Sequence, residues 1–150
     1  MRKGIIVFFA IIMTAPVAFA GEGLVSKKSA YSVAETLNKL EKALKQKGIV
    51  VFARIDHAAG AKKAGMQLRA TAVLIFGNPK LGTPLMQSNQ TIGIDLPLKA
   101  LAWEDEKGQV WLTYNAPAFL ADRHRITDRA QVLKKMTGAL QRLTGAATKP

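Results

Sequence analysis

Residues 32–55 read SVAETLNKLEKALKQKGIVVFARI, an amphipathic segment followed directly by a run of residues that favour β-structure. Ser32 and Glu35 match a capping box, in which each side chain accepts a hydrogen bond from the backbone of the other residue. The apolar residues recur at helical spacing and form one stripe: Val33, Leu37, Leu40 and Leu44. Gly48 is a natural end for this helix. We therefore predict a helix from Ser32 to Gly48 and a strand from Ile49 to Ile55.

Other elements are expected on both sides of this segment. Strands are predicted at 24–29, 67–76, 96–103 and 109–114, the last two as a hairpin around the polar turn Glu104–Gly108. Helices are predicted at 83–90 and 128–144, with shorter ones at 58–64 and 118–124. The order of the main elements is β-α-β-β-α-β-β-α. This order predicts an α+β fold, a single compact domain with a mainly antiparallel sheet packed against two longer helices.

The expected ends of the later helices come from capping signals. Thr83 is the expected N-cap of the helix at 83–90, with Pro84 at its first position. Thr127 or Asp128 is expected to cap the closing helix. Residues 145–150 are expected to form a frayed tail.

The first twenty residues have the layout of a secretory signal peptide. Arg2 and Lys3 precede an apolar stretch, residues 4–15, and the small residues Ala18 and Ala20 form a cleavage signal. We therefore expect residues 1–20 to be a signal peptide cut after Ala20, residues 21–150 to be the domain, and the protein to be periplasmic or secreted. An uncleaved N-terminal anchor is the alternative.

Composition excludes several classes of function. The chain has 150 residues, 49% of them hydrophobic and 21% charged, as in ordinary globular proteins. It has no cysteine, which excludes disulfides, thiolate metal sites and a cysteine nucleophile, and its two histidines exclude any site that needs three. The net charge of +12 indicates either attraction to an anionic surface or a generally solvated basic surface. With 7% aromatic residues and export expected, no nucleic-acid partner is predicted.

Several motifs in fixed order resemble those of the DUF302 family, also called TT1751-like. They are Phe52–His57, Leu74–Lys80, Gly82–Met86, Ile94–Pro97, Trp103–Asp105 and Val110–Tyr114, and the resemblance covers residues 24–143. It implies a compact α+β domain that forms a homodimer. It implies no established activity, since the family is one of unknown function.

Five residues are candidates for a ligand site. Asp56 and His57 end a strand, where functional groups are readily presented to a ligand. The other three candidates come from the resemblance motifs: Asn78, Asp105 and Tyr114. The alternative reading is structural: Asp56 caps the following turn, His57 fills a polar niche, and Asn78 shapes a turn. Trp103, Trp111 and Tyr114 are either an aromatic wall for an apolar ligand or part of the core.

His57 and His124 are the candidates for a metal site. If they converge, they could bind copper or zinc, with Asp56 or a methionine, Met66 or Met86, as a third ligand; haem is a further possibility. The structural alternatives are a solvated basic segment around His124 and core filling by the methionines.

The segment Gly77–Thr83 imitates a phosphate-binding loop but lacks the lysine before its final hydroxyl residue, so nucleotide binding is rejected. The sequence thus favours an exported, non-enzymatic protein that binds a small ligand or a protein partner, with no cofactor predicted. The alternatives are a metal-binding protein or metal-assisted enzyme, and an interaction module for an anionic surface.

Overall fold

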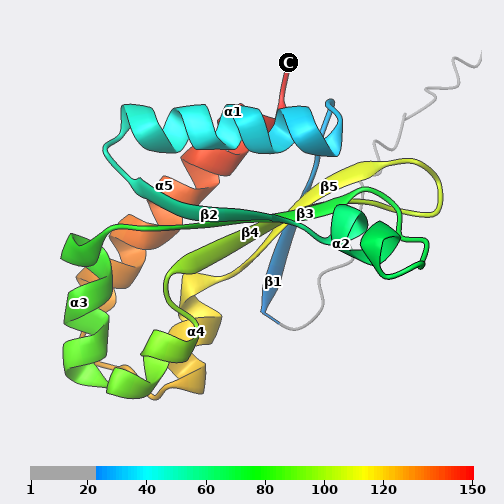
Figure 1. Ribbon diagram of the computed structural model, residues 1–150. Helices are drawn as coiled ribbons and strands as arrows, with labels where there is room; N and C mark the ends of the chain where they lie inside the picture. The colour runs from blue at the N-terminus through cyan, green and yellow to red at the C-terminus, as the bar shows by residue number, and fades with distance from the viewer. Residues whose placement is uncertain (1–22) are drawn as a thin grey trace, which may run out of the picture.

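The structure, a computed structural model, describes residues 23–150 (Figure 1). The expected signal peptide, residues 1–20, lies outside the described residues. The strands are β1 (Leu24–Lys28), β2 (Val50–Asp56), β3 (Thr71–Gly77), β4 (Leu98–Glu104) and β5 (Val110–Asn115). The helices are α1 (Val33–Gln46), α2 (His57–Lys63), α3 (Pro79–Ser88), the 3-10 helix η1 (Gln90–Ile94), α4 (Pro117–Arg123) and α5 (Ala130–Thr148).

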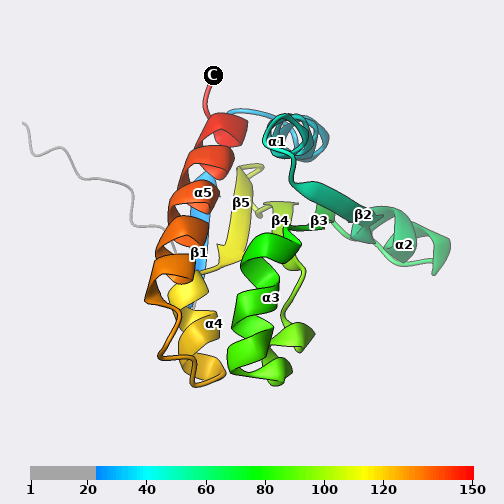
Figure 2. The same ribbon diagram turned by 90° about the vertical axis from the view of Figure 1, so that its left-hand side faces the viewer.

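The five strands form one antiparallel sheet in the order β1-β5-β4-β3-β2. The helix α1 carries the chain from the β1 edge to the opposite β2 edge. The two longest helices, α1 and α5, pack on the sheet and on each other, while α3, η1 and α4 gather at one end (Figures 1 and 2). The predicted α+β fold, with an antiparallel sheet against two longer helices, is confirmed.

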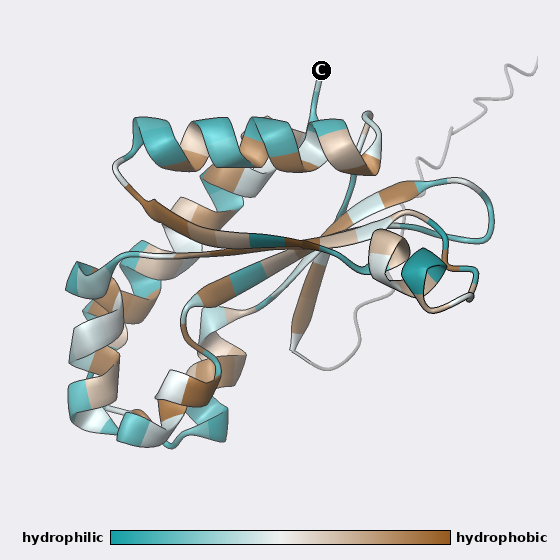
Figure 3. Cartoon of the chain, viewed as in Figure 1, coloured by the Kyte–Doolittle hydropathy of each residue, from teal (hydrophilic) through white to brown (hydrophobic). Residues whose placement is uncertain are grey.

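The helix α1 is built as its pattern predicts. The side chain of Ser32 accepts a hydrogen bond from the backbone of Glu35, and the Glu35 side chain accepts one from the backbone of Ser32. The three leucines of the stripe have no exposed surface: Leu37, Leu40 and Leu44. Figure 3 shows the hydrophilic side of α1 turned outward and its apolar side turned toward the sheet. This burial provides most of the stabilisation of the helix, because isolated helices of this length are marginal in water.

The start of α3 differs from the prediction. The helix begins at Pro79 rather than after Thr83, and Pro84 lies inside it. The side chain of Asn78 caps the helix by accepting a hydrogen bond from the backbone N–H of Lys80, at 2.9 Å. Asn78 as N-cap and Pro79 at the first position give the helix a complete start signal five residues before the predicted pair, Thr83 and Pro84. The carbonyl of Pro84 accepts a hydrogen bond from Arg129.

The bounds of α5 also differ. The expected caps, Thr127 and Asp128, do not cap it: the N-cap position is Arg129, which makes no side-chain cap hydrogen bond. The Asp128 carboxylate instead accepts hydrogen bonds from the hydroxyl of Ser88 and the guanidinium of Arg129.

At the other end, α5 continues to Thr148, so the frayed tail predicted at 145–150 is wrong for residues 145–148. Ala147 and Thr148 are buried. The hydroxyls of Thr144 and Thr148 donate to the carbonyls of Leu140 and Thr144 one turn earlier. None of the helices formed by residues 23–150 has both the length and the apolar character needed to cross a membrane.

The packing of α1 predicts a large cost for cutting back its central leucine. Leu40→Ala should lower the free energy of unfolding by about 2–5 kcal/mol, because a fully buried leucine is lost and a cavity remains. Chemical denaturation monitored by circular dichroism measures this. The exposed neighbour Lys42→Ala is the control and should change stability by less than about 0.5 kcal/mol. Equal losses in the two variants would contradict the packing described here.

Candidate functional site

Asp56 and His57 lie where β2 passes into α2. One carboxylate oxygen of Asp56 accepts a hydrogen bond from the backbone N–H of Ala59 at 2.9 Å, so Asp56 is the N-cap of α2. His57 is the first residue of the helix, and its side chain is exposed. Adjacent residues at such a junction point apart, and no hydrogen bond joins this carboxylate and imidazole among the described residues.

Asp105 organises the turn between β4 and β5. Its carboxylate accepts backbone N–H bonds from Lys107 and Gln109, both at 2.9 Å, and the indole N–H of Trp111 at 2.8 Å. The Trp111 hydrogen bond is the main cause that holds the pKa of Asp105 below its ordinary value, with the two backbone bonds and the charge of Lys107 adding to it. Both carboxylate oxygens of Asp105 therefore hold the hairpin together.

The aromatic residues are divided between the two faces of the sheet. The rings of Trp103 and Trp111 stack with centroids 6.5 Å apart on the face away from α1 and α5, and the Trp103 indole donates to Thr113. Tyr114 points to the helical side, where it is 4% exposed. Burial raises the pKa of its phenol, an effect partly opposed by a hydrogen bond with Thr144 of α5. Tyr114 is thus a core residue, and these three residues do not form one wall.

The five residues predicted as one ligand site therefore lie in separate places. In the β2–β3 pair, Asp56 is opposite Ala72 and Val50 is opposite Gly77. Asn78 follows Gly77, so it lies at the far end of that pair from Asp56 and His57. Asp105 is in the β4–β5 turn, and Tyr114 is within the core. The antiparallel register places these residues far apart, and their spacing in the sequence does not reveal this separation.

His124 is buried, whereas its neighbours Arg123 and Arg125 are exposed, so the expected solvated basic segment holds for the two arginines and not for the imidazole. It is 7% exposed, and both ring nitrogens are engaged: Nε2 contacts the Asp95 carboxylate at 2.6 Å and Nδ1 contacts the Thr91 hydroxyl at 2.8 Å. The Asn89 side chain donates to the His124 carbonyl. The imidazole thus joins the end of α4 to η1. Sequence reasoning gave Asp95 no part in this cluster, because the two residues are 29 positions apart and share no motif.

The two histidines do not converge. His57 starts α2 and His124 ends α4, and Figures 1 and 2 place these helices on different sides of the molecule. Within residues 23–150, no group of three or more His, Asp or Glu side chains is arranged to hold a metal ion. Met66 is 60% exposed after α2, and Met86 faces a cavity described next.

A cavity of about 320 Å³ lies between α3, α5 and the sheet. Its volume is at the lower end of the range of about 300–1,000 Å³ that is typical of small-molecule sites. Figure 2 looks toward this end of the molecule, with α3 in front and α5 to its left. The walls are largely apolar and include Phe52, Phe76, Leu81, Met86, Leu96 and Met136.

Polar side chains enter this wall at two places. Asn78 and Thr83 are the lining residues with polar side chains, and the lining contains no charged residue. Of the five predicted ligand-site residues, Asn78 therefore faces the cavity, and none of the other four lines it. The arrangement can enclose an apolar group and offer it a few hydrogen bonds.

Comparison with known proteins identifies the family. A family described as "Domain of unknown function DUF302" matches residues 25–143. The chain belongs to the DUF302 family. The crystal structure of an uncharacterised conserved DUF302 protein from Bacillus stearothermophilus matches with a TM-score of 0.76 and 17% sequence identity, over 85% of this chain and 99% of that chain. At 17% identity, this likeness shows that the two proteins share a fold and shows nothing more.

Closer sequence relatives carry a different name. The chain is 51% identical over 127 residues to "Fluoride-specific ion channel FluC 1" of Brucella suis, which covers 85% of this chain and 49% of that protein. The match to "Fluoride-specific ion channel FluC 2" of Brucella melitensis has the same identity and covers 46% of that protein. The chain thus spans about half the length of these relatives.

The cavity of this DUF302 domain was missed by sequence reasoning for a physical reason. Leu81, Leu96, Met136 and Leu140 have the spacing and hydrophobicity of core residues. A hydrophobic pattern indicates which side chains face the interior. It does not indicate whether those side chains pack together without leaving a cavity.

The Asp105 cluster predicts a specific dependence of stability on pH. A carboxyl whose pKa is lowered on folding adds stability above its unfolded pKa, and this is lost as the pH falls through the folded value. Asp105→Asn should therefore be less stable than wild type at pH 7 and should lose less of its remaining stability on acidification. The free energy of unfolding between pH 7 and pH 2 measures both effects.

Glu106→Gln is the matched control, because it removes one charge from the same turn and Glu106 makes no side-chain hydrogen bond among the described residues. We expect wild-type stability and pH dependence in this variant. Identical behaviour of the two variants would show that the Asp105 hydrogen bonds do not stabilise the hairpin.

Proposed function

We propose that this DUF302 domain is an exported binding protein for a small, mainly apolar ligand, which it holds in the cavity between α3 and α5. The observation that carries the proposal is the cavity itself. Its volume, about 320 Å³, and its apolar wall with two polar side chains match the usual composition of ligand sites. Export is proposed from the signal-peptide pattern of residues 1–20.

The cavity contrasts with the usual close packing of protein interiors, which supports a specific use for this space. Native cores contain few voids larger than a water molecule. The side chains of the main core reach full burial across α1 and the sheet, as at Leu40, Leu74 and Leu112. An apolar cavity loses dispersion contacts along its walls, and an apolar ligand would restore them.

The proposal assigns no chemical reaction to the cavity. The titratable side chains singled out in the sequence, Asp56, His57, Asp105 and His124, are absent from its lining. Asp105 and His124 are engaged in structural hydrogen bonds. A binding role is therefore supported better than general acid–base catalysis at this site.

Filling the cavity tests the proposal. Gly82 lines it, and a Cβ atom built at Gly82 would lie 3.6 Å from a methyl group of Leu96, an ordinary contact. A leucine at this position would extend into the cavity. Gly82→Leu should weaken binding of the neutral fluorophore N-phenyl-1-naphthylamine by about tenfold or more. Fluorescence titration of the purified protein measures the affinity.

Gly60→Leu is the matched control. Gly60 also lies within a helix, α2, and a Cβ there would meet nothing within 4 Å. This variant should bind the fluorophore as the wild type does. Retained binding in Gly82→Leu, with both variants folded by circular dichroism, would contradict the proposal.

A second candidate function is an accessory role beside a fluoride channel. The observation in its favour is the 51% identity to one half of Brucella proteins named as fluoride-specific ion channels. In those proteins a domain similar to this one is covalently joined to another segment of comparable length, which suggests a shared task.

Growth in fluoride tests this second candidate. A strain that lacks this protein should tolerate less fluoride than its parent, and a plasmid copy of the gene should restore growth. Tolerance to chloride at the same concentrations serves as the control for general salt stress. Unchanged fluoride tolerance in the deletion strain would remove the accessory role.

A further inference from the structure

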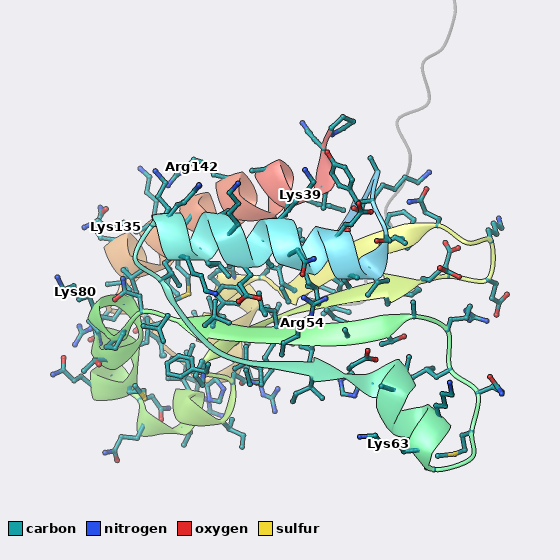
Figure 4. All side chains as sticks on the ribbon, turned by 45° about the horizontal axis from the view of Figure 1, so that its top comes forward. Lys39, Arg54, Lys63, Lys80, Lys135 and Arg142 are labelled. Carbon is teal, nitrogen blue, oxygen red and sulfur yellow. The ribbon has the colours of Figure 1, made fainter. Side chains whose placement is uncertain are left out.

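Three lysines are close in the sequence to residues that line the cavity. Lys80 lies between two lining residues, Pro79 and Leu81, and Lys135 precedes the lining residue Met136. Figure 4 shows Lys80 on α3 and Lys135 on α5 at the same end of the molecule. A third lysine, Lys47, stands two residues before the lining residue Ile49.

This charge is not balanced by acidic partners. Lys47, Lys80 and Lys135 are exposed, and none of them forms an ion pair within residues 23–150. The cavity lining itself contains no Asp or Glu. Asp95, which precedes the lining residue Leu96, is already engaged by His124 and Arg123. An excess of charge of one sign near a cleft attracts ligands of the opposite sign and raises their association rate.

The polar contact at the cavity also favours an anion. The side-chain oxygen of Asn78 already accepts the backbone N–H of Lys80. Its amide nitrogen, which only donates hydrogen bonds, has no partner among the described residues. The group that Asn78 can offer to a ligand is therefore a donor, which suits a carboxylate or another oxyanion and does not suit an ammonium group.

We infer, on the basis of the proposed cavity function, that the ligand is an amphipathic organic anion with an apolar body in the cavity and an oxyanion head group near Asn78, Lys80 and Lys135. A medium-chain carboxylate has this chemistry, and so does the acyl chain and head group of an anionic lipid. The size of the cavity, about 320 Å³, favours a single short chain over a lipid with two long chains.

Three ligands with the same chain length and different head groups distinguish the contribution of the head group to binding from that of the apolar body. Decanoate, decanol and decyltrimethylammonium are titrated against protein loaded with N-phenyl-1-naphthylamine. Decanoate should displace the fluorophore at about three- to tenfold lower concentration than decanol, and the cation should be the weakest. The advantage of decanoate should shrink as salt is raised, since exposed charges are screened.

Matched charge variants locate the effect. The double variant Lys80→Ala, Lys135→Ala should lose most of the preference for decanoate over decanol. The control double variant Lys62→Ala, Lys63→Ala removes the same charge from α2, at the other end of the molecule (Figure 4), and should keep the preference. An equal loss in both pairs would overturn the inference, because it would show a general effect of net charge. Asn78→Ala is not used, since it also removes the cap of α3.

Separate outcomes bear on the head group and on the cavity. Equal displacement by all three ligands would overturn the anionic head group and leave the cavity function standing. Failure of every ligand, together with unchanged fluorophore binding in Gly82→Leu, would overturn the cavity function itself. Binding to phosphatidylglycerol vesicles that needs Lys80 and Lys135, without displacement of the fluorophore by decanoate, would assign these lysines to a membrane surface and overturn the inference.

Discussion

Burial of one apolar stripe of α1 against the sheet is the interaction on which the rest of the structure depends. Leu37, Leu40 and Leu44 are fully covered, and the helix spans the sheet between its two edge strands. Beyond Gln46, where α1 ends, the wall that faces the sheet is made by α3 and α5. The cavity lies there, and no residue of α1 lines it. The point at which α1 ends therefore also determines where the cavity lies.

Much of the fold could be predicted because its signals are local. The capping box at Ser32, the α1 stripe and the polar turn between β4 and β5 each lie within a short segment. The start of α3 and the end of α5 were predicted less accurately. The start of α3 depends on which of two competing caps is used, Asn78 or Thr83. The last turn of α5 is held by the burial of Ala147 and Thr148, which follows from tertiary packing.

The candidate site was less accessible to sequence reasoning than the fold. Asn78 was selected from its motif and does face the cavity, whereas Asp56, Asp105 and Tyr114 have structural roles and His57 is exposed away from the cavity. Asp56 caps a helix and Asp105 holds a hairpin. Polar residues with these structural roles at turns were therefore interpreted as residues of a ligand site. The partnership of His124 with Asp95 depends on the docking of η1 against α4, which no spacing in the chain encodes.

The pairing of β1 with β5 has a consequence for how the chain folds. Ser26 and Thr113 share a hydrogen bond across 87 residues, so β1, the first strand within residues 23–150, cannot pair until β5, the last one there, has formed. Contacts of such long range slow folding, because the loop between them has to be ordered before they form. β2, β3 and β4 pair with neighbours that follow closely in the chain and can assemble earlier. The β1 edge is thus the part of the sheet whose pairing depends on the whole of the intervening chain.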